Sequence, residues 1–468
     1  MITFFISLIC LILGFFIYGR FVEKVFNPTT KPTPAIAHND GVDYIPLPTW
    51  KVFMIQLLNI AGLGPIFGAI AGALWGPVVY FWIVIGTIFS GAVHDYLAGM
   101  ISLRHNGESI SEIVGLYLGD TMKTVMRIFS VVLLVLVGTV FMTGPALLLA
   151  KLTPDTLDFN FWLIVVLVYY FLATLLPIDK IIGKIYPLFG ACLIIMAVGV
   201  AGGIIAGGWQ MPEMTLQNLH PKDLPIWPLM FITVACGATS GFHATQSPLM
   251  ARCMKDERNG RTVFYGAMVA EGIIALIWAS AGIAFYETTG GLAAAVANGG
   301  PGSVVYDVSF GTLGAVGGLL AMVGVIACPI TSGDTAFRSA RYTLADWFKL
   351  DQVSHTKRLS LALPLLVLGG ILSQMNFDII WRYFSWANQT LAMIALWTGA
   401  MYLWKQYPGS WKHYIAVIPA IFMTMVTFTY ILQAPEGFGL STSITYPAGI
   451  IIAVFWTIVY FKATVFKK

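Results

Sequence analysis

The chain has 468 residues, of which 58% are hydrophobic and only 10% carry a charge, and its mean hydropathy is +0.81. A soluble protein of this length needs far more charge to cover its surface, so the composition excludes that class and predicts an all-α polytopic membrane protein. The net charge of +4 does not indicate nucleic-acid binding, and the five scattered cysteines indicate neither a metal site nor a disulfide framework.

Apolar runs separated by polar turns predict about thirteen transmembrane helices. The first run, within 1–22, has no basic residue before it, so it is expected to be a retained helix rather than a signal peptide. A Pro-rich segment, 23–51, is too polar to span and is expected to form a cytoplasmic loop. The other expected helices are 52–76, 77–103, 121–150, 160–177, 184–208, 225–251, 261–286, 307–337, 358–374, 379–404, 411–433 and 445–463.

The placement of lysine and arginine supports this count. If the N-terminus is outside, the expected helices place every one of the 26 Lys and Arg residues on the cytoplasmic side except Lys151, Lys222 and Arg382. Membrane proteins carry an excess of lysine and arginine on their cytoplasmic loops. We therefore expect the N-terminus outside, the C-terminus in the cytoplasm, and the lipid bilayer as the surrounding medium.

The helix 52–76 is interrupted near its middle, where two glycines and a proline fall within 62–65. In a helix interior a glycine costs about 1 kcal/mol and a proline about 3 kcal/mol, so the helix is expected to unwind there. Lipid cannot satisfy the freed backbone groups, which must face protein or a wet cavity. The half-helix that begins at Pro65 would direct its free N–H groups at an anion. The sequence therefore predicts a carboxylate-binding site at Gly62, Leu63 and Gly64.

A second interruption, at 237–248, lies five helices later along the chain. The two broken helices then cross in opposite directions, so 52–208 and 225–404 are predicted to form an inverted repeat of five plus five helices, with 411–468 outside it. Polar groups at the second break are expected to contact substrate or ion: Thr239, Ser240, Gly241, His243 and Gln246. The alternative is a helix interior whose hydroxyls bond to their own carbonyls, with His243 as a structural histidine.

Several ionisable residues fall inside the expected helices, where their cost makes them functional candidates. Asp334 is a candidate proton carrier or gate, or else the partner of Arg338 four residues on. His94 and Asp95 could relay protons or close an inner gate, or else cap the loop after their helix. Glu271 is a candidate protonation site supported only by its expected burial.

Several motifs, in this order along nearly the whole chain, give it a resemblance to the carbon starvation (CstA) transporter family. They are Asp40–Tyr44, Ile60–Pro65, Ser90–Tyr96, Arg104–Gly107, Ile330–Arg341 and Ala387–Gln389. The resemblance implies a carrier of the bacterial inner membrane that takes up pyruvate or peptides, with proton coupling in the pyruvate carriers.

A second resemblance is to the LeuT-type transporters of five-plus-five helices. The segment Asn59–Gly64 is similar to their first-helix break, and Cys328–Ser332 to their eighth core helix, although Pro329 departs from that pattern. The resemblance implies a possible bound sodium ion and no other cofactor. Its ligands would be the carbonyls of Leu58, Ala61 and Cys328 and the hydroxyls of Thr331 and Ser332, and such oxygen ligands suit a hard cation.

Together these features predict a secondary active importer of small carboxylate nutrients driven by H⁺ or Na⁺. A membrane sensor or a channel for the same substrates is the alternative. No Walker loop, nucleophile elbow or catalytic pair stands out in the sequence, so we expect neither an ATP-driven pump nor an enzyme. Pyruvate and peptide remain open as substrates, and the sequence is silent on oligomeric state and regulation.

Overall fold

The computed structural model describes residues 1–40, 44–175, 178–350 and 354–465, and regular structure in these ranges is helical apart from one isolated bridge. Short π-helical and 3₁₀-helical turns join some of the α-helices. The α-helices are α1 (Ile2–Leu13), α2 (Gly19–Phe26), α3 (Pro34–Ala37), α4 (Thr49–Ile60), α5 (Ala69–Gly72), α6 (Val79–Gly86), α7 (Ala92–Arg104), α8 (Ile110–Leu118), α9 (Asp120–Leu152), α10 (Phe159–Leu175), α11 (Ile178–Ala206), α12 (Leu229–Thr233), α13 (Phe242–Ala251), α14 (Gly266–Tyr286), α15 (Thr289–Phe348), α16 (His355–Leu372), α17 (Phe377–Gln406), α18 (Tyr414–Gln433) and α19 (Thr442–Ala463).

Eight helical spans in the described ranges are long and apolar enough to cross a membrane, or nine if the bent pair Thr49–Ile60 and Gly64–Trp75 counts as one. A lipid bilayer requires about 20 mostly apolar residues per helical crossing, which these spans provide. The expectation of an all-α polytopic membrane protein is therefore confirmed.

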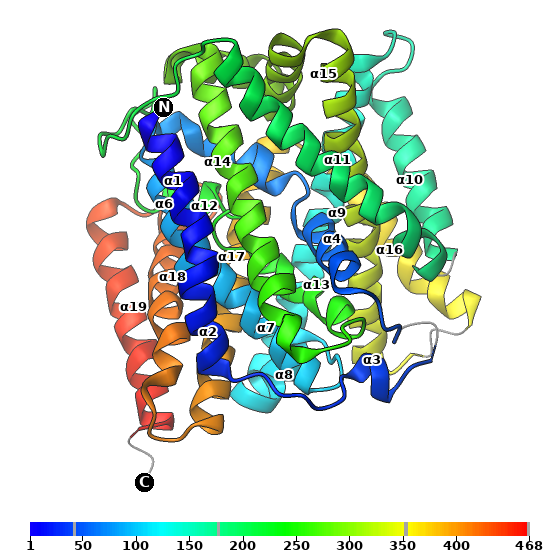
Figure 1. Ribbon diagram of the computed structural model, residues 1–468, viewed down its shortest axis with the longest axis vertical. Helices are drawn as coiled ribbons and strands as arrows, with labels where there is room; N and C mark the ends of the chain where they lie inside the picture. Colours follow the sequence, from blue (N-terminus) through cyan, green and yellow to red (C-terminus); the bar gives the residue numbers. More distant parts are fainter. Residues whose placement is uncertain (41–43, 176–177, 351–353, 466–468) are drawn as a thin grey trace.

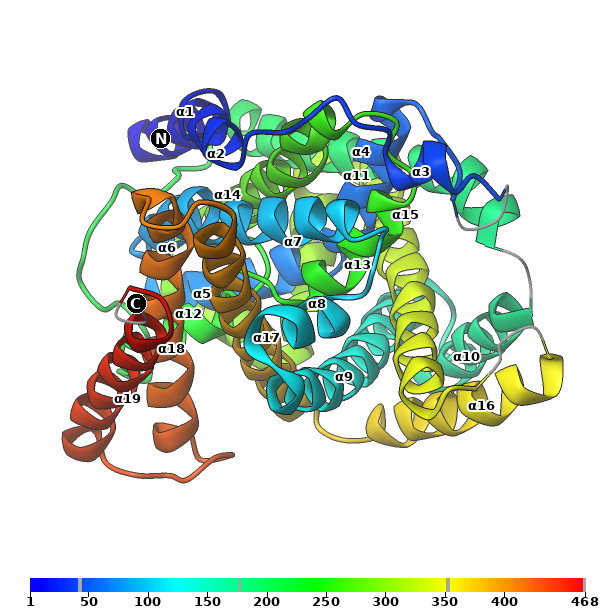
Figure 2. The ribbon, with the colours of Figure 1, turned by 90° about the horizontal axis from the view of Figure 1, so that it is seen from below.

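The long helices run side by side between two ends of the molecule, with the N-terminus at one end and the C-terminus at the other (Figure 1). Seen from the C-terminal end, α7 and α13 lie inside the bundle, while α1, α10, α16 and α19 lie on its outside (Figure 2). The burial of the apolar spans agrees with this placement: 28% of an apolar 18-residue stretch within Ile2–Phe26 is buried, against 78% of such a stretch within Val79–Arg104, which contains α7. The outer helices thus present their apolar side chains to the surroundings, as lipid-facing helices do.

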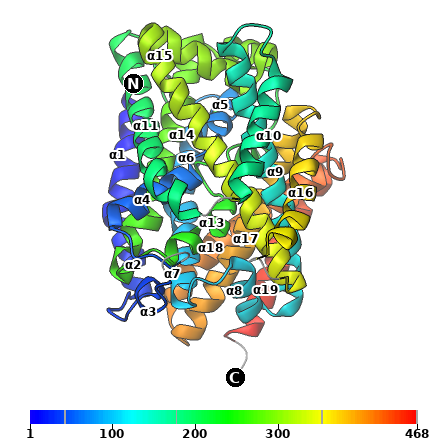
Figure 3. The same ribbon diagram turned by 90° about the vertical axis from the view of Figure 1, so that its right-hand side faces the viewer.

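Helix α15 differs from the expected helix 307–337. Its backbone leaves the helical region at Gly299, Gly300 and Gly314, and Gly300 and Gly314 have positive φ angles of 69° and 67°. Glycine adopts such angles without a Cβ penalty. The breaks divide α15 into 289–298, 301–313 and a long helix, 315–348, and the first part lies across the N-terminal end of the bundle (Figure 3).

Two surface segments, one at each end of the molecule, make contacts with parts of the chain that are far away in the sequence. At the N-terminal end the Met1 ammonium lies 2.6 Å from Glu213 Oε1, and this contact together with Thr3 lowers the pKa of Glu213 to about 2. At the other end the polar loop before α4 pairs with the chain after α13, since Leu47 N donates to Cys253 O at 3.0 Å. Gly41, Val42 and Asp43 of the first family motif lie outside the described residues.

Candidate functional site

The first broken helix unwinds where the sequence predicts. Helix α4 ends at Ile60, a new helical segment begins at Gly64, and the two parts are bent by 54°. Helix α15 satisfies the backbone that this break frees: Ser332 Oγ donates to Leu58 O at 2.9 Å, and Cys328 Sγ lies 3.2 Å from Ala61 O. Protein groups, rather than lipid, thus complete the break.

The second break separates α12 from α13, and Gly237 within it has a φ of 87°. The chain before α7 holds one side of the break, because Trp82 Nε1 donates to Val234 O at 3.1 Å and Thr87 Oγ1 donates to Gly237 O at 2.9 Å. On the other side, Gln389 Nε2 of α17 donates to Phe231 O at 2.6 Å. The freed carbonyls therefore find side-chain donors on two different helices.

Asn388 caps the start of α13. Its Oδ1 accepts from Phe242 N at 2.7 Å, its Nδ2 donates to Ser240 Oγ at 3.0 Å, and its backbone carbonyl accepts from Gly241 N at 3.1 Å. Asparagine is among the residues that satisfy orphan helix N–H groups best, although here it reaches α13 from another helix. Two of the expected substrate contacts, Ser240 and Gly241, are thus occupied in holding the break.

The first break packs directly against the second break at Gly64 and against α9 at Gly62. A Cβ added to Gly64 would lie 2.2 Å from Cys236 Cβ, and one added to Gly62 would lie 2.5 Å from the Phe141 ring. Leu63, beside them, is fully buried. The expected carboxylate site at Gly62, Leu63 and Gly64 is therefore closed in this structure, with glycine permitting the close approach.

Four ionisable side chains form a continuous buried network beside the second break. Asp95 Oδ1 lies 2.7 Å from His94 Nδ1, and Asp95 Oδ2 lies 2.7 Å from His243 Nδ1. The other ring nitrogen of His243, Nε2, lies 3.3 Å from Glu271 Oε2. None of the four side chains is exposed. The network joins α7, α13 and α14, which are far apart in sequence.

The contacts of Asp95 bear on the alternatives left open for this residue. Both of its carboxylate oxygens face histidines, and the loop after α7 is held by other groups: Arg252 Nε donates to Gly107 O at 3.0 Å, and Ser102 Oγ donates to Glu108 O at 2.8 Å. A buried carboxylate is stabilised by such hydrogen bonds and costs a large free energy without them. The arrangement can store and pass a proton between its members.

Asp334 lies in a separate ion pair. Its Oδ2 is 3.2 Å from Arg338 Nη2, and that same guanidinium nitrogen donates to Ala173 O on α10 at 2.9 Å. Both side chains are buried. The ion pair joins two residues of α15 that are four positions apart, and Arg338 also links it to α10 through Ala173 O.

The five groups expected to hold a cation do come together. Ser332 Oγ lies within hydrogen-bonding distance of Leu58 O and Cys328 O, and Thr331 Oγ1 donates to Cys328 O at 2.7 Å. Among these oxygens, however, lies the Cys328 thiol, 3.2 Å from Ala61 O and 3.5 Å from Leu58 O. The oxygens fit a hard cation, but a soft thiol sulfur does not suit sodium.

Helices α4 and α13 pack against one another, and several buried polar atoms without a protein partner lie on them and in the second break. They are both amide atoms of Gln56, Asn59 Oδ1, Thr239 Oγ1 and Gln246 Oε1. Buried polar groups are nearly always hydrogen-bonded, so unpartnered ones at a helix break are suited to a ligand or water. Gln56 was not among the expected site residues, and its only sequence signal is an amide within an apolar run.

The comparisons with known proteins agree with this architecture. The model of the family "Carbon starvation protein CstA" matches residues 1–154, 146–297 and 280–430. An uncharacterized membrane protein of Haemophilus influenzae is 44% identical over 64% of this chain and 95% of its own length. The peptide transporter CstA of Escherichia coli is 24% identical over 91% of this chain and 80% of its own length. The pyruvate/proton symporter BtsT of the same bacterium is 27% identical over 53% of this chain and 44% of its own length.

Among solved structures, MhsT in complex with L-phenylalanine superposes with a TM-score of 0.57 at 15% identity, over 88% of this chain and 98% of its own. This likeness concerns the fold, which is that of the LeuT-type transporters. Family and fold are those of membrane transporters and not of enzymes. The chain belongs to the carbon starvation protein CstA family.

Proposed function

We propose that this protein is a proton-coupled secondary transporter that imports small carboxylate nutrients, pyruvate or short peptides, across the bacterial inner membrane. The observation that carries the proposal is the buried network of His94, Asp95, His243 and Glu271, because ionisable groups held inside a membrane protein are costly and mark ion or proton pathways. The names of two relatives, a peptide transporter and a pyruvate/proton symporter, support the substrate class.

The proposed topology has about thirteen crossings, with the N-terminus outside and the C-terminus in the cytoplasm. The repeats would be 52–208 and 225–404, with 1–22, the loop 23–51 and the two helices of 411–468 outside them. The opposite positions of the termini support an odd number of crossings (Figure 1). The similar interruption of α4 and of the α12–α13 segment supports the pairing of the two halves.

The substrate carboxylate would bind between the two breaks when the closed packing opens. On one side lie the N–H groups at Gly62 and Gly64, at the start of a helical segment, where an anion is favoured. On the other side lies the unpartnered hydroxyl of Thr239. Gln56, on α4, adds an amide donor that is completely buried and has no protein partner.

Protons are favoured over sodium as the coupling ion by two observations. The buried network offers groups that can titrate, whereas the expected sodium site contains the Cys328 thiol between the carbonyls of Leu58 and Ala61. Ser332 Oγ donates to Leu58 O at 2.9 Å, and the Cys328 thiol can donate its one hydrogen to Ala61 O at 3.2 Å, so both carbonyls have a protein donor without a cation. A sodium ion at Leu58, Ala61, Cys328, Thr331 and Ser332 is the competing arrangement, and only a transport measurement distinguishes the two.

The test is uptake into proteoliposomes of the full chain, with labelled pyruvate and labelled dialanine offered in parallel. A pH gradient and a sodium gradient are imposed separately, and protein-free vesicles supply the background. We expect accumulation above the equilibrium level under the pH gradient alone. Accumulation under sodium alone would overturn proton coupling, and binding without accumulation under either gradient would indicate a sensor or channel.

A further inference from the structure

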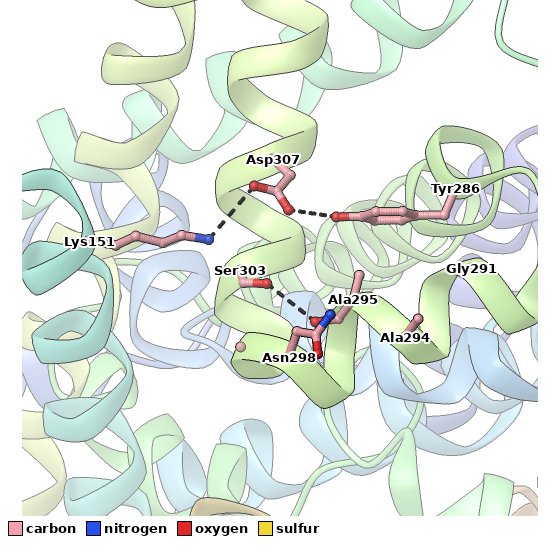
Figure 4. A pocket seen from close by; sticks show the side chains of 9 residues that line it. Lys151, Tyr286, Gly291, Ala294, Ala295, Asn298, Ser303 and Asp307 are labelled. Carbon is pink, nitrogen blue, oxygen red and sulfur yellow. Dashed lines mark hydrogen bonds and ion pairs between the residues drawn. The ribbon is translucent and has the colours of Figure 1, made fainter.

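A second site lies at the N-terminal end of the molecule, away from the breaks. It is a cavity of about 540 Å³, formed where the end of α9, the last turn of α14 and the first two segments of α15 meet (Figure 4). The backbone break at Gly299 and Gly300 turns the second segment of α15 back beside the first, which creates the cavity walls. Small-molecule sites in proteins commonly have volumes of about 300–1,000 Å³.

One cation and one anion lie close together in the lining of this cavity. Lys151 Nζ of α9 lies 3.7 Å from Asp307 Oδ1 of α15, a distance too long for a hydrogen bond. The two side chains are 41% and 42% exposed, so water screens their attraction and the pair contributes little to stability. The other carboxylate oxygen, Oδ2, accepts from Tyr286 at 2.8 Å, and Lys151 Nζ lies 4.7 Å from the centroid of the Tyr306 ring.

These charges match a ligand that carries both an ammonium and a carboxylate. Such a zwitterion can place its carboxylate on Lys151 and its ammonium on Asp307, so that each protein charge exchanges one partner for another. A simple monocarboxylate would take Lys151 from Asp307 and leave two carboxylates side by side, which is unfavourable. Asn298 and Ser303 add neutral polar groups to the lining. The cavity is thus matched to zwitterions over simple anions.

We propose that this cavity, which we call the Lys151–Asp307 pocket, is an outer docking site for the zwitterion of a short peptide or amino acid. The inference rests on the proposed function, which places this end of the molecule outside the cell. Lys151 is one of only three basic residues on that side in the proposed topology, so a positive charge is scarce there. The pocket raises the local concentration of substrate and does not take part in proton coupling.

The test uses the full chain in proteoliposomes with Ala294, an exposed residue of the pocket lining, changed to cysteine. A membrane-impermeant maleimide labels this residue, and the unchanged chain supplies the background from its native cysteines. We expect dialanine to slow the labelling, and N-acetyl-dialanine and pyruvate to leave it unchanged. Asp307→Asn and Lys151→Gln should each abolish the protection. Ala295→Cys, also in the lining, replaces the reporter if Ala294→Cys fails to fold.

Uptake kinetics give a second readout. Lys151→Gln should raise the KM for dialanine by about tenfold, the size of one lost charge-assisted hydrogen bond, and leave kcat unchanged. Lys222→Gln, the matched change at another basic residue of the same side, should alter neither. Equal labelling with and without dialanine, or equal protection by pyruvate, would overturn the pocket. Protection without any gradient-driven uptake would instead support the pocket and overturn the proposed transport.

Discussion

We expect Glu271→Gln to abolish proton-driven accumulation and to leave substrate exchange intact. Glu271 is completely buried, and its Oε2 faces His243 Nε2 at 3.3 Å, so glutamine fits the same space but cannot take up a proton. Two carboxylates and two imidazoles make up the network. With both carboxylates ionised and both imidazoles neutral, its formal charge is −2, and one bound proton changes it to −1. One proton per substrate and a gradient of one pH unit supply about 1.4 kcal/mol, which corresponds to about tenfold accumulation.

The assay is accumulation of labelled substrate in proteoliposomes clamped at zero membrane potential. The wild type should reach a ratio of about ten and the variant a ratio of about one, under a gradient of one pH unit. Counterflow exchange, which needs no net proton movement, should persist in Glu271→Gln. Asp334→Asn is the matched control, since Asp334 is a buried carboxylate paired with Arg338 instead. Normal accumulation by Glu271→Gln, or its loss in Asp334→Asn alone, would refute the assignment.

Three further changes test the breaks themselves. Asn388→Ala removes the cap of α13 and should lower stability by about 1–3 kcal/mol, measured by thermal unfolding in detergent. Gly64→Ala should lower stability by about 1–3 kcal/mol through overpacking against Cys236, and Cys236→Gly in the same chain should recover most of that stability. No recovery in the double variant would contradict the contact. Ser332→Ala should preserve the proton-driven accumulation ratio. If this variant loses accumulation and the wild type requires sodium, the sodium site is supported instead.

The membrane class and the first break could be predicted from sequence because each follows from local chemistry. Apolar runs of membrane length predict helices, and glycines with a proline at 62–65 predict the bend that separates α4 from the segment at Gly64. The start of the helix expected at 307 was wrong, because the residues before Gly314 are apolar enough to resemble part of the span. Only the positive φ of that glycine separates the two segments.

The site was harder to predict because its contacts are distant in sequence. His94 and Asp95 were candidates as a neighbouring pair, but 148 residues separate Asp95 from His243 along the chain. Hydrophobic periodicity gives the existence of helices and says little about which faces meet. Glu271 had burial as its only sequence signal, and its place beside His243 depends on how α13 and α14 pack.

The proton network and the two breaks share one contact, Cys236. Its sulfur lies within 4.8 Å of the ligand atoms of His243 and Glu271, and its Cβ packs against Gly64 of the first break. Charges this close in a buried site are screened little, so a proton gained by Glu271 changes the attraction between α13 and α14 directly beside that contact. In the proposed mechanism, substrate binding requires the same contact to open. In that mechanism, a bound proton and a bound substrate carboxylate act on the same packed contact from its two sides. This shared contact would couple them without a relay between distant sites.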